Sequence, residues 1–166
     1  MSTADNLKEA FAGESQANRK YLAFAKKAEA EGFKQVAKLF RAASAAETFH
    51  AHAHLRVMGG VKGTADNLQV AKDGEGYEFQ QMYPKFVAEA KAEGNTAAVT
   101  SFEYAMAVEK VHYNLYDKAL QAVTGGKDLP AEAIYICPVC GNTFIGTLPE
   151  KCEICGVTKD KFSPVK

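Results

Sequence analysis

Two Glu-x-x-His pairs are the residues of this sequence best suited to chemistry. Glu47 and His50 form the first pair, and Glu109 and His112 form the second. Residues three positions apart on a helix lie on one face, so each pair can offer a carboxylate and an imidazole to the same metal ion. A single pair of this kind is common on a solvated helix. Its repetition in both halves of the chain predicts a binuclear metal site.

Two further glutamates complete the predicted ligand set. Glu14 lies one turn beyond Phe11 on an apolar stripe, and Glu78 lies one turn before Met82. Buried carboxylates are costly unless they are paired or bound to metal, so four of them on core-facing stripes require cations. One Glu from each of two helices, with Glu-x-x-His from each of the other two, is the ligand set of di-iron and di-manganese bundles.

The predicted centre holds two metal ions bridged by Glu47 and Glu109. Ligation rich in oxygen suits iron or manganese better than zinc. We expect each ion to have one terminal carboxylate and one histidine as well, and all six residues to be catalytic. The terminal ligands are Glu14 with His50 on one side and Glu78 with His112 on the other.

Three other polar residues lie near these ligands in the sequence. His52 is about 200° around the helix from His50 and should face away. His54 follows His50 by one turn, and we favour a core or supporting histidine over a ligand. Tyr21 lies two turns beyond Glu14 and could be either a hydrogen-bond partner of a ligand carboxylate or a core tyrosine.

All four cysteines lie near the C-terminus, in two C-x-x-C motifs that are each followed by glycine. The cysteines are Cys137, Cys140, Cys152 and Cys155. Clustered pairs indicate a tetrahedral four-thiolate metal site rather than the disulfides of a secreted scaffold. Zinc ribbons and rubredoxin-type iron sites share this ligand set, so the motif alone leaves the metal open. A neighbouring di-iron bundle favours iron, because zinc has no redox chemistry.

Four helices are required to position the helical ligands. Residues 3–124 are rich in Ala, Glu, Lys and Gln, and glycines recur where helices should end. Short turns predict two antiparallel hairpins, and the Gly-rich residues 59–74 predict a long crossover between helices two and three, as in ferritin-like folds. We place the third helix at about 74–93, with Pro84 as a source of a kink.

The two predicted hairpins repeat each other. A shift of 62 residues, from position 47 to position 109, superposes the Glu-x-x-His pairs and also Gly32 on Gly94. The predicted fold is therefore mainly α, a four-helix bundle over 1–126. A linker over 127–133 precedes a small rubredoxin-like metal-knuckle domain over 134–166.

Composition argues against several classes of partner. Lys plus Arg and Asp plus Glu number 20 each, so the net charge is zero and neither nucleic acid nor an anionic membrane is expected. No apolar run approaches the roughly 18 residues of a membrane span, and the N-terminal residues do not have the pattern of a signal peptide. The expected location is the cytoplasm.

The combination of a duplicated di-iron bundle and a C-terminal knuckle pair resembles the rubrerythrin family over residues 3–166. The segments that carry it are GESQANRKYLAF, AAETFHAHAHL, YEFQQMYP, VEKVH and YICPVCGNTFIGTLPEKCEICG. The resemblance implies a non-haem peroxidase that reduces hydrogen peroxide to water in oxidative-stress defence. It implies two irons in the bundle and one iron held by the cysteines, through which electrons enter.

The resemblance also implies partners. Members are usually homodimers, in some of which helices are exchanged between subunits, and the tetracysteine iron is expected to serve a di-iron site across the dimer. The sequence has no nucleotide-binding motif, so a separate NAD(P)H-dependent donor, such as a rubredoxin reductase, is expected.

One position, three residues after Glu78, departs from the family pattern. The family has a second glutamate three residues later, where this sequence has Gln81. That extra carboxylate binds one iron in the oxidised state, and the iron moves to the helix-two histidine on reduction. We therefore expect His50 to hold its iron in both redox states, or the movement to be weakened.

Two other functions fit the same residues. The bundle could oxidise ferrous iron with dioxygen, as an iron-handling ferritin-like protein. Alternatively, the chain could be a non-catalytic protein that binds zinc at both sites.

Overall fold

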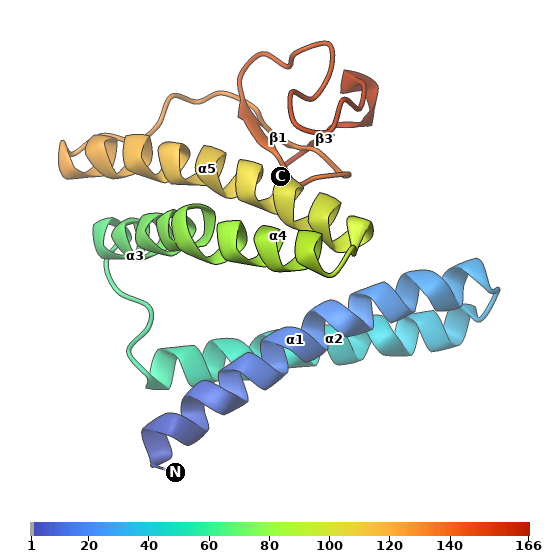
Figure 1. Ribbon diagram of the computed structural model, residues 1–166. Helices are drawn as coiled ribbons and strands as arrows, with labels where there is room; N and C mark the ends of the chain where they lie inside the picture. Colours follow the sequence, from blue (N-terminus) through green and yellow to red (C-terminus); the bar gives the residue numbers. More distant parts are fainter. Residues whose placement is uncertain (1) are drawn as a thin grey trace. The chain divides into compact units, whose positions relative to one another are not determined.

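The computed structural model describes residues 2–166 and shows long helices followed by a small β region (Figure 1). Met1, the first residue of the predicted helical domain, lies outside the described residues. This mainly helical fold with a small C-terminal β region is as predicted. The chain divides into two compact units, Met1–Lys62 and Gly63–Lys166. The predicted domain boundary near residue 126 follows a change in composition and stays a prediction.

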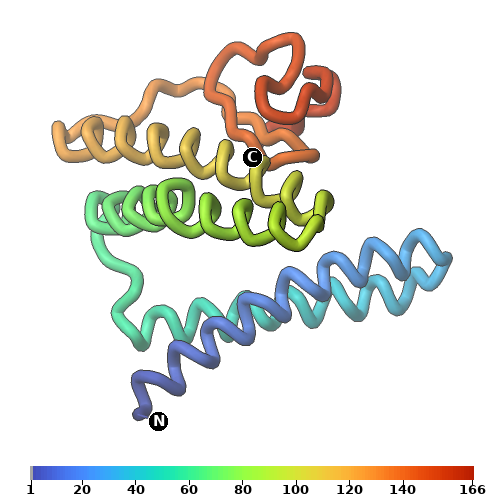
Figure 2. The backbone as a smooth tube through the Cα atoms, in the orientation of Figure 1, coloured from blue at the N-terminus to red at the C-terminus, as the bar shows by residue number. Residues whose placement is uncertain are grey.

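The first unit is an antiparallel hairpin of α1 (Thr3–Ala30) and α2 (Lys34–Val57), which Figure 2 shows side by side. α1 begins with a capping box. The Ser2 hydroxyl accepts a hydrogen bond from the Asp5 backbone N–H, and the Asp5 carboxylate accepts one from the Ser2 N–H. Gly32 in the turn has a φ of +87°, a conformation that favours glycine.

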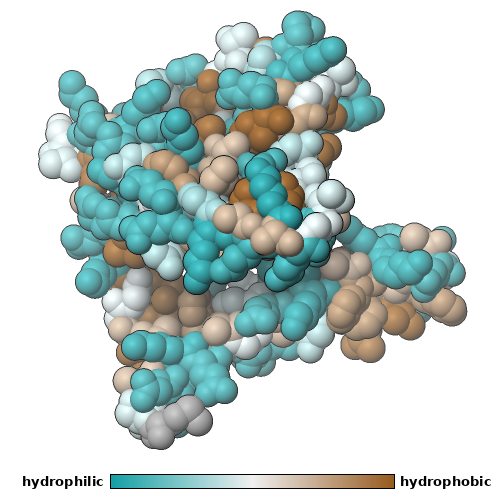
Figure 3. Space-filling model, in the orientation of Figure 1, coloured by the Kyte–Doolittle hydropathy of each residue, from teal (hydrophilic) through white to brown (hydrophobic). Residues whose placement is uncertain are grey.

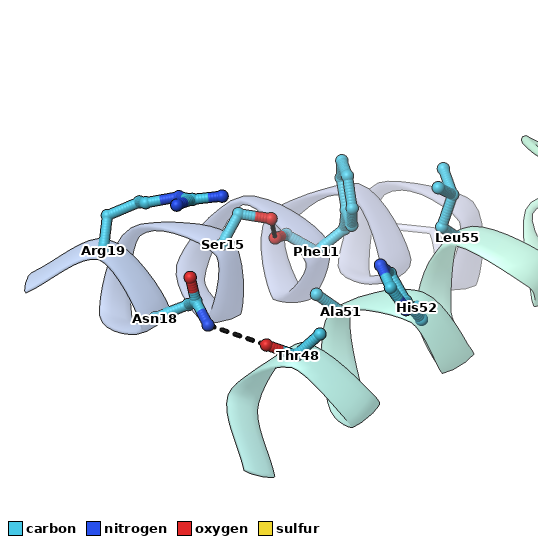
Figure 4. A pocket seen from close by; sticks show the side chains of 8 residues that line it. All are labelled: Phe11, Ser15, Asn18, Arg19, Thr48, Ala51, His52 and Leu55. Carbon is cyan, nitrogen blue, oxygen red and sulfur yellow. Dashed lines mark hydrogen bonds between the residues drawn. The ribbon is translucent and has the colours of Figure 1, made fainter. Parts of the chain in front are cut away.

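A polar contact joins the two helices of this hairpin (Figure 4). The Asn18 side-chain amide lies 2.8 Å from the Ser44 carbonyl oxygen and 2.7 Å from the Thr48 hydroxyl. Ser44 is only 2% exposed, and its hydroxyl donates to the Asn18 carbonyl oxygen. Because a buried hydroxyl requires partners, this network fixes how α1 and α2 align along their axes.

The second unit contains a nearly continuous helix and a return helix. The first consists of α3 (Thr64–Tyr77), the π-helical segment η1 (Glu78–Met82) and α4 (Tyr83–Ala92). α5 (Thr96–Thr124) then runs back beside them, as Figure 2 also shows.

The long crossover predicted over residues 59–74 is largely helical. α3 begins at Thr64, ten residues before the start predicted at position 74, which leaves residues 58–63 as the connection. Gly63 has extended backbone angles at the helix start, and Asp66 lies in the first turn, where a negative charge is favourable. The glycines of this stretch lowered its apparent helix propensity, but packing against α5 outweighs that preference.

The π-helical segment explains how the helix passes Pro84 without breaking. A proline has no N–H to donate and crowds the carbonyl one turn earlier. In η1 the N–H of Tyr83 donates to the carbonyl of Glu78, five residues back. The wider turn is equivalent to one inserted residue, and it occurs directly before the proline.

The two hairpins repeat each other in packing as well as in sequence. Each contains three aromatic rings whose centroids lie 5.6 to 6.3 Å apart. The rings are Tyr21, Phe24 and Phe40 in the first hairpin and Tyr83, Phe86 and Phe102 in the second. An ion pair recurs with the charges exchanged, between Arg41 and Glu29 and between Glu103 and Lys91. The predicted duplication thus extends to the side-chain contacts within each hairpin.

The C-terminal region is a small antiparallel sheet with its own core. Strands β1 (Ile134–Ile136), β2 (Thr143–Ile145) and β3 (Ser163–Pro164) are ordered β2-β1-β3. The buried residues of its core are Cys137, Cys152 and Phe162. Two cysteines therefore lie inside this core.

Apolar side chains remain on the surface of the first hairpin. Phe33, Val36 and Leu39, near the turn between α1 and α2, are 59%, 45% and 69% exposed, and Figure 3 shows hydrophobic surface over this end of the hairpin. Within residues 2–166, no helix combines the length and apolar character needed to cross a membrane.

The Asn18 network predicts a measurable contribution to stability. Replacement of Asn18 by Leu removes the side-chain N–H groups that donate to the Ser44 carbonyl and to the Ser44 and Thr48 hydroxyls, so the free energy of unfolding should fall by about 1–3 kcal/mol. Urea denaturation of the metal-free full chain measures this loss. Gln16→Leu, at an exposed position of the same helix, is the control and should change stability far less. Equal losses in the two variants would contradict the role given to Asn18.

Candidate metal centres

The first unit brings Glu14, Glu47 and His50 together. The His50 Nδ1 atom lies 2.9 Å from Glu47 Oε2 and 3.9 Å from Glu14 Oε1. One ligand atom from each residue falls within 4.8 Å of the others, close enough to share an ion. This cluster is fairly open, because the His50 side chain is 56% exposed.

The second unit brings Glu75, Glu109 and His112 together in the same way. The His112 Nδ1 atom lies 2.9 Å from Glu109 Oε2 and 3.6 Å from Glu75 Oε1. Again the ligand atoms fall within 4.8 Å of one another. The His112 side chain is 25% exposed, so this cluster is more enclosed than the first.

Glu75 is the cluster residue that the sequence analysis missed, and Glu78 lies outside this group. The signal was present in the sequence. The pentapeptide TADNL begins both α1, at Thr3, and α3, at Thr64, and this shift of 61 residues carries Glu14 onto Glu75. After η1 the shift is 62, because the π-helical turn adds one residue. A single shift of 62 therefore misaligned the first part of this helix.

The interpretation of Gln81 requires correction for the same reason. α3 and η1 contain two glutamates three residues apart, Glu75 and Glu78, so the helix has the second carboxylate that it was expected to lack. Gln81 is a different position, in the last turn of η1. Gln81 therefore gives no reason to expect that His50 holds its iron in both redox states.

The second cluster concentrates negative charge in a partly buried place, and this raises the pKa values of several titratable groups there. Burial, followed by the charge of Glu109, raises the pKa of Glu75 to about 7. The same two causes raise the pKa of Glu78. The hydrogen bond to Glu109 raises the pKa of His112. These groups therefore hold protons more tightly than usual, and a bound cation would replace those protons.

Two tyrosines adjoin the second cluster. Burial raises the pKa of both Tyr83 and Tyr116, and the charges of nearby carboxylates add to the shift. Their hydroxyls are therefore neutral and can donate hydrogen bonds. The Tyr116 ring lies 6.5 Å from the imidazole of His112. Its position in the sequence had not marked it as a site residue.

The other predicted neighbours have the following positions. Tyr21 packs in the aromatic triplet of its hairpin. His54 is half-buried one turn beyond the first cluster, and does not belong to it. His52 is exposed and lines a hollow of about 230 Å³ with Asn18 and Arg19, drawn in Figure 4.

The four cysteines form one compact group. The Sγ atoms of Cys137 and Cys155 lie 3.5 Å apart, and those of Cys140 and Cys152 lie 3.6 Å apart. A tetrahedral ion with metal–sulfur bonds near 2.3 Å separates its sulfurs by roughly 3.8 Å, so a single ion fits with little adjustment.

The glycine after each C-x-x-C motif closes its knuckle. Gly141 and Gly156 have φ of +84° and +76°, and their N–H groups donate to the carbonyls of Cys137 and Cys152. The resulting turns direct backbone N–H groups at sulfur. Burial raises the pKa of Cys152, but backbone and thiol hydrogen bonds outweigh it and lower the value to about 7. Burial raises the pKa of Cys140. One readily formed thiolate among protonated thiols can begin metal capture.

The cysteine region touches the second helical cluster within the same unit. Thr143, the first residue of β2, places its hydroxyl 3.0 Å from the Nε2 atom of His112. The two residues also line a largely apolar cavity of about 270 Å³ together with Tyr116. His112 is therefore in direct contact with the cysteine region through Thr143.

Comparison with known proteins agrees with these two kinds of site. Residues 5–120 match the family Rubrerythrin, and residues 135–163 match "Rubrerythrin, rubredoxin-like domain". The chain belongs to the rubrerythrin family. Rubrerythrin-2 of Clostridium acetobutylicum is 38% identical over 96% of this chain and 95% of its own length. Nigerythrin of Nitratidesulfovibrio vulgaris is 38% identical over 98% of this chain and 86% of its own length.

Solved structures of nigerythrin are also similar. The fully reduced, all-ferrous state is 35% identical and covers 99% of this chain and 87% of the nigerythrin chain, with a TM-score of 0.60. The partially reduced state has the same TM-score at 36% identity. The chain is thus a di-iron and rubredoxin-like member of a family of oxidoreductases associated with oxidative stress. Its acidic and histidine clusters suit a di-iron centre, and its cysteines suit an iron-tetracysteine centre.

The raised pKa of Glu75 predicts the pH dependence of the metal-free protein. A carboxyl group whose pKa rises from 4.5 to about 7 on folding stabilises the fold below pH 4.5, and that contribution is lost as the pH rises through about 7. Glu75→Gln should therefore raise the melting temperature at pH 8, on the order of 2–4 °C, with little effect at pH 4.5. Thermal melts in the presence of a chelator measure this.

The control for this prediction is Glu9→Gln, at an exposed position on α1. It should leave the pH profile of stability unchanged. If Glu75→Gln lowers stability at pH 8, or if both variants change the profile equally, mutual repulsion in the second cluster is not the cause.

Proposed function

We propose that this protein is a non-haem di-iron peroxidase that reduces hydrogen peroxide to water in oxidative-stress defence. The observation that supports it most directly is the recurrence of a Glu, Glu, His cluster in a chain that also has four clustered cysteines. The first provides carboxylate-rich ligation for iron, and the second provides thiolate ligation for an iron that transfers single electrons. Neither feature alone would distinguish a redox enzyme from a metal store.

The residues that would hold the di-iron centre are those of the two clusters, with Glu47 and Glu109 as the carboxylates that would each share an ion with a histidine. His50 and His112 are the proposed nitrogen ligands. The proposed terminal carboxylates are Glu14, Glu75 and Glu78. Glu75 is added to the two that were predicted from the sequence, because it lies in the second cluster. When bound, the irons supply the two electrons that break the O–O bond, and the tetracysteine iron supplies electrons to replace them.

In this proposal, side chains beside the metals supply protons and hydrogen bonds to the peroxide. Reduction of one hydrogen peroxide to two waters consumes two electrons and two protons, so proton donors are required beside the metals. Glu78 has a raised pKa and lies outside the three-residue cluster, so its carboxyl group can hold and donate a proton whenever it is not bound to iron. The Tyr116 hydroxyl is neutral and can hold an oxygen atom of the substrate by a hydrogen bond. The apolar walls beside His112 limit the access of water.

Other parts of this proposal concern partners. The electron donor would be a separate NAD(P)H-dependent protein such as a rubredoxin reductase. The active form would be a homodimer in the cytoplasm, consistent with the exposed apolar side chains of the first hairpin. The domain limits remain those proposed from the sequence, at 1–126, 127–133 and 134–166.

The choice between peroxide and dioxygen is tested by stopped-flow spectroscopy of the fully reduced, iron-loaded protein. Peroxide should reoxidise it faster than dioxygen at equal concentration. Faster reoxidation by dioxygen would instead favour a ferrous iron oxidase. A colourless protein whose cysteine site holds zinc after expression in iron-rich medium would favour the non-catalytic zinc alternative.

Glu78 provides a test of the proton-donor assignment. Glu78→Gln keeps the size of the side chain but removes the acidic proton, so peroxide reduction should slow by about 100-fold, the typical contribution of general acid catalysis. Steady-state rates over pH 5 to 9, with the iron content measured for each sample, check this. The control is Glu89→Gln, at an exposed position on α4, which should retain the wild-type rate. A variant that loses iron rather than rate would make Glu78 a ligand without a role in proton transfer.

A further inference from the structure

Asn142 and Thr143 are consecutive residues whose side chains reach two different metal clusters. The Thr143 hydroxyl lies 3.0 Å from His112 Nε2, and the Asn142 side-chain nitrogen lies 3.9 Å from Cys152 Sγ. Consecutive side chains of extended chain point to opposite sides. The dipeptide therefore extends from the cysteine core to the surface of α5 within one unit of one chain.

The Asn142 side chain is fully buried, with a relative exposure of 0%. Its backbone carbonyl accepts the N–H of Cys137, which fixes it against the first knuckle. Among the described residues, its Oδ1 atom is the buried side-chain oxygen without a hydrogen-bond partner. A buried amide is costly without strong partners, and a metal-bound thiolate is a stronger acceptor than a thiol. The N–H that Asn142 directs at the Cys152 sulfur is thus a side-chain hydrogen bond of this buried amide, and it becomes stronger when the sulfur is a metal-bound thiolate.

The Thr143 contact indicates which ring nitrogen of His112 carries a proton when an ion is bound. The Nδ1 atom of His112 faces Glu109 at 2.9 Å and Glu75 at 3.6 Å, which is the side on which an ion would bind. If the ion occupies Nδ1, the proton must be on Nε2, from which it donates to the Thr143 hydroxyl. The imidazole ring is then held from both sides, by the helical carboxylates and by the cysteine region.

We propose that Asn142 and Thr143 are positioning residues that couple the cysteine site to the His112 site within a single chain. Asn142 sets the reduction potential of the tetracysteine iron by donating to Cys152, and Thr143 transmits metal binding at His112 to the same strand. This inference rests on the proposed function only in that both sites hold metal. It concerns binding and potentials, so its tests require no turnover.

The Thr143 contact is tested by NMR of the zinc-loaded full chain. The His112 Nε2–H should give a slowly exchanging resonance in the wild type and in Thr143→Ser, which keeps the hydroxyl. Thr143→Val should lose that protection. Thr147→Val, at an exposed position of the same region, is the matched control and should retain it. A resonance equally protected in Thr143→Val would overturn the role of Thr143.

The Asn142 contact is tested by the reduction potential of iron in the cysteine site. Loss of an N–H donor to sulfur destabilises the more negative reduced form, so Asn142→Leu should lower the potential by about 59 mV, a tenfold change in the one-electron equilibrium. Asn142→Ser, a smaller change that is too short to reach the sulfur, should lower it similarly. Phe162→Leu loosens the same core without removing the donor and should leave the potential near that of the wild type. Equal shifts of the reduction potential in all three variants would mean that Asn142 acts only through packing.

The coupling itself is tested by measuring that potential with the helical sites empty and with them loaded with zinc. In the wild type, zinc at the helical sites should shift the potential of the cysteine iron. In Thr143→Val the shift should be smaller, because only the through-space effect of the zinc charge remains, whereas Thr147→Val should keep the full shift. An identical shift in Thr143→Val would overturn the coupling. A protein that passes these tests but does not reduce peroxide would refute only the proposed peroxidase.

Discussion

The mutual repulsion of closely spaced carboxylates is the constraint on which the rest of this structure depends. Glu75 and Glu109 share one partly buried cluster, and a single imidazole cannot offset both charges. A fold without a bound cation would be expected to separate such groups. Instead, α3 and α5 hold them together, and the side chains respond by retaining protons. The helical hairpin thus stores an electrostatic cost that a divalent ion would relieve.

The two hairpins achieve this arrangement by the same means. Each positions a carboxylate on one helix against a Glu-x-x-His pair on the other, above a triplet of packed aromatic rings. The second hairpin then departs from the repeat in two ways that bear on chemistry. It has an additional carboxylate, Glu78, and its histidine contacts Thr143 of the cysteine region. Duplication explains the common ligands, and these two additions make the second hairpin different from the first.

Much of the fold and most of the clustered residues were predictable from the sequence because they depend on local spacing. The Glu-x-x-His pairs and the C-x-x-C-Gly motifs specify which side chains share a face or a turn, whatever surrounds them. The start of α3 was not predictable in this way, because its glycines disfavour a helix that packing against α5 stabilises. Glu75 was missed because its alignment depends on the π-helical turn, a hydrogen-bond pattern that composition does not reveal. Thr143 was missed because its partner lies on α5, 31 positions away in the sequence.

The π-helical turn makes the position of Glu75 a matter of chain length as well as residue type. Each residue of an α-helix turns the chain by about 100°, so one extra residue in a regular helix would rotate Glu75 by that angle relative to α4. The second hairpin has this extra residue, because eight positions separate Glu75 from Tyr83 where seven separate Glu14 from Tyr21, and the π-helical turn absorbs it. Loss of one residue from η1 would therefore restore the spacing of α1 and leave Glu75 beside Glu109, whereas a further insertion would turn it away. The site thus tolerates a change of chain length in one direction only.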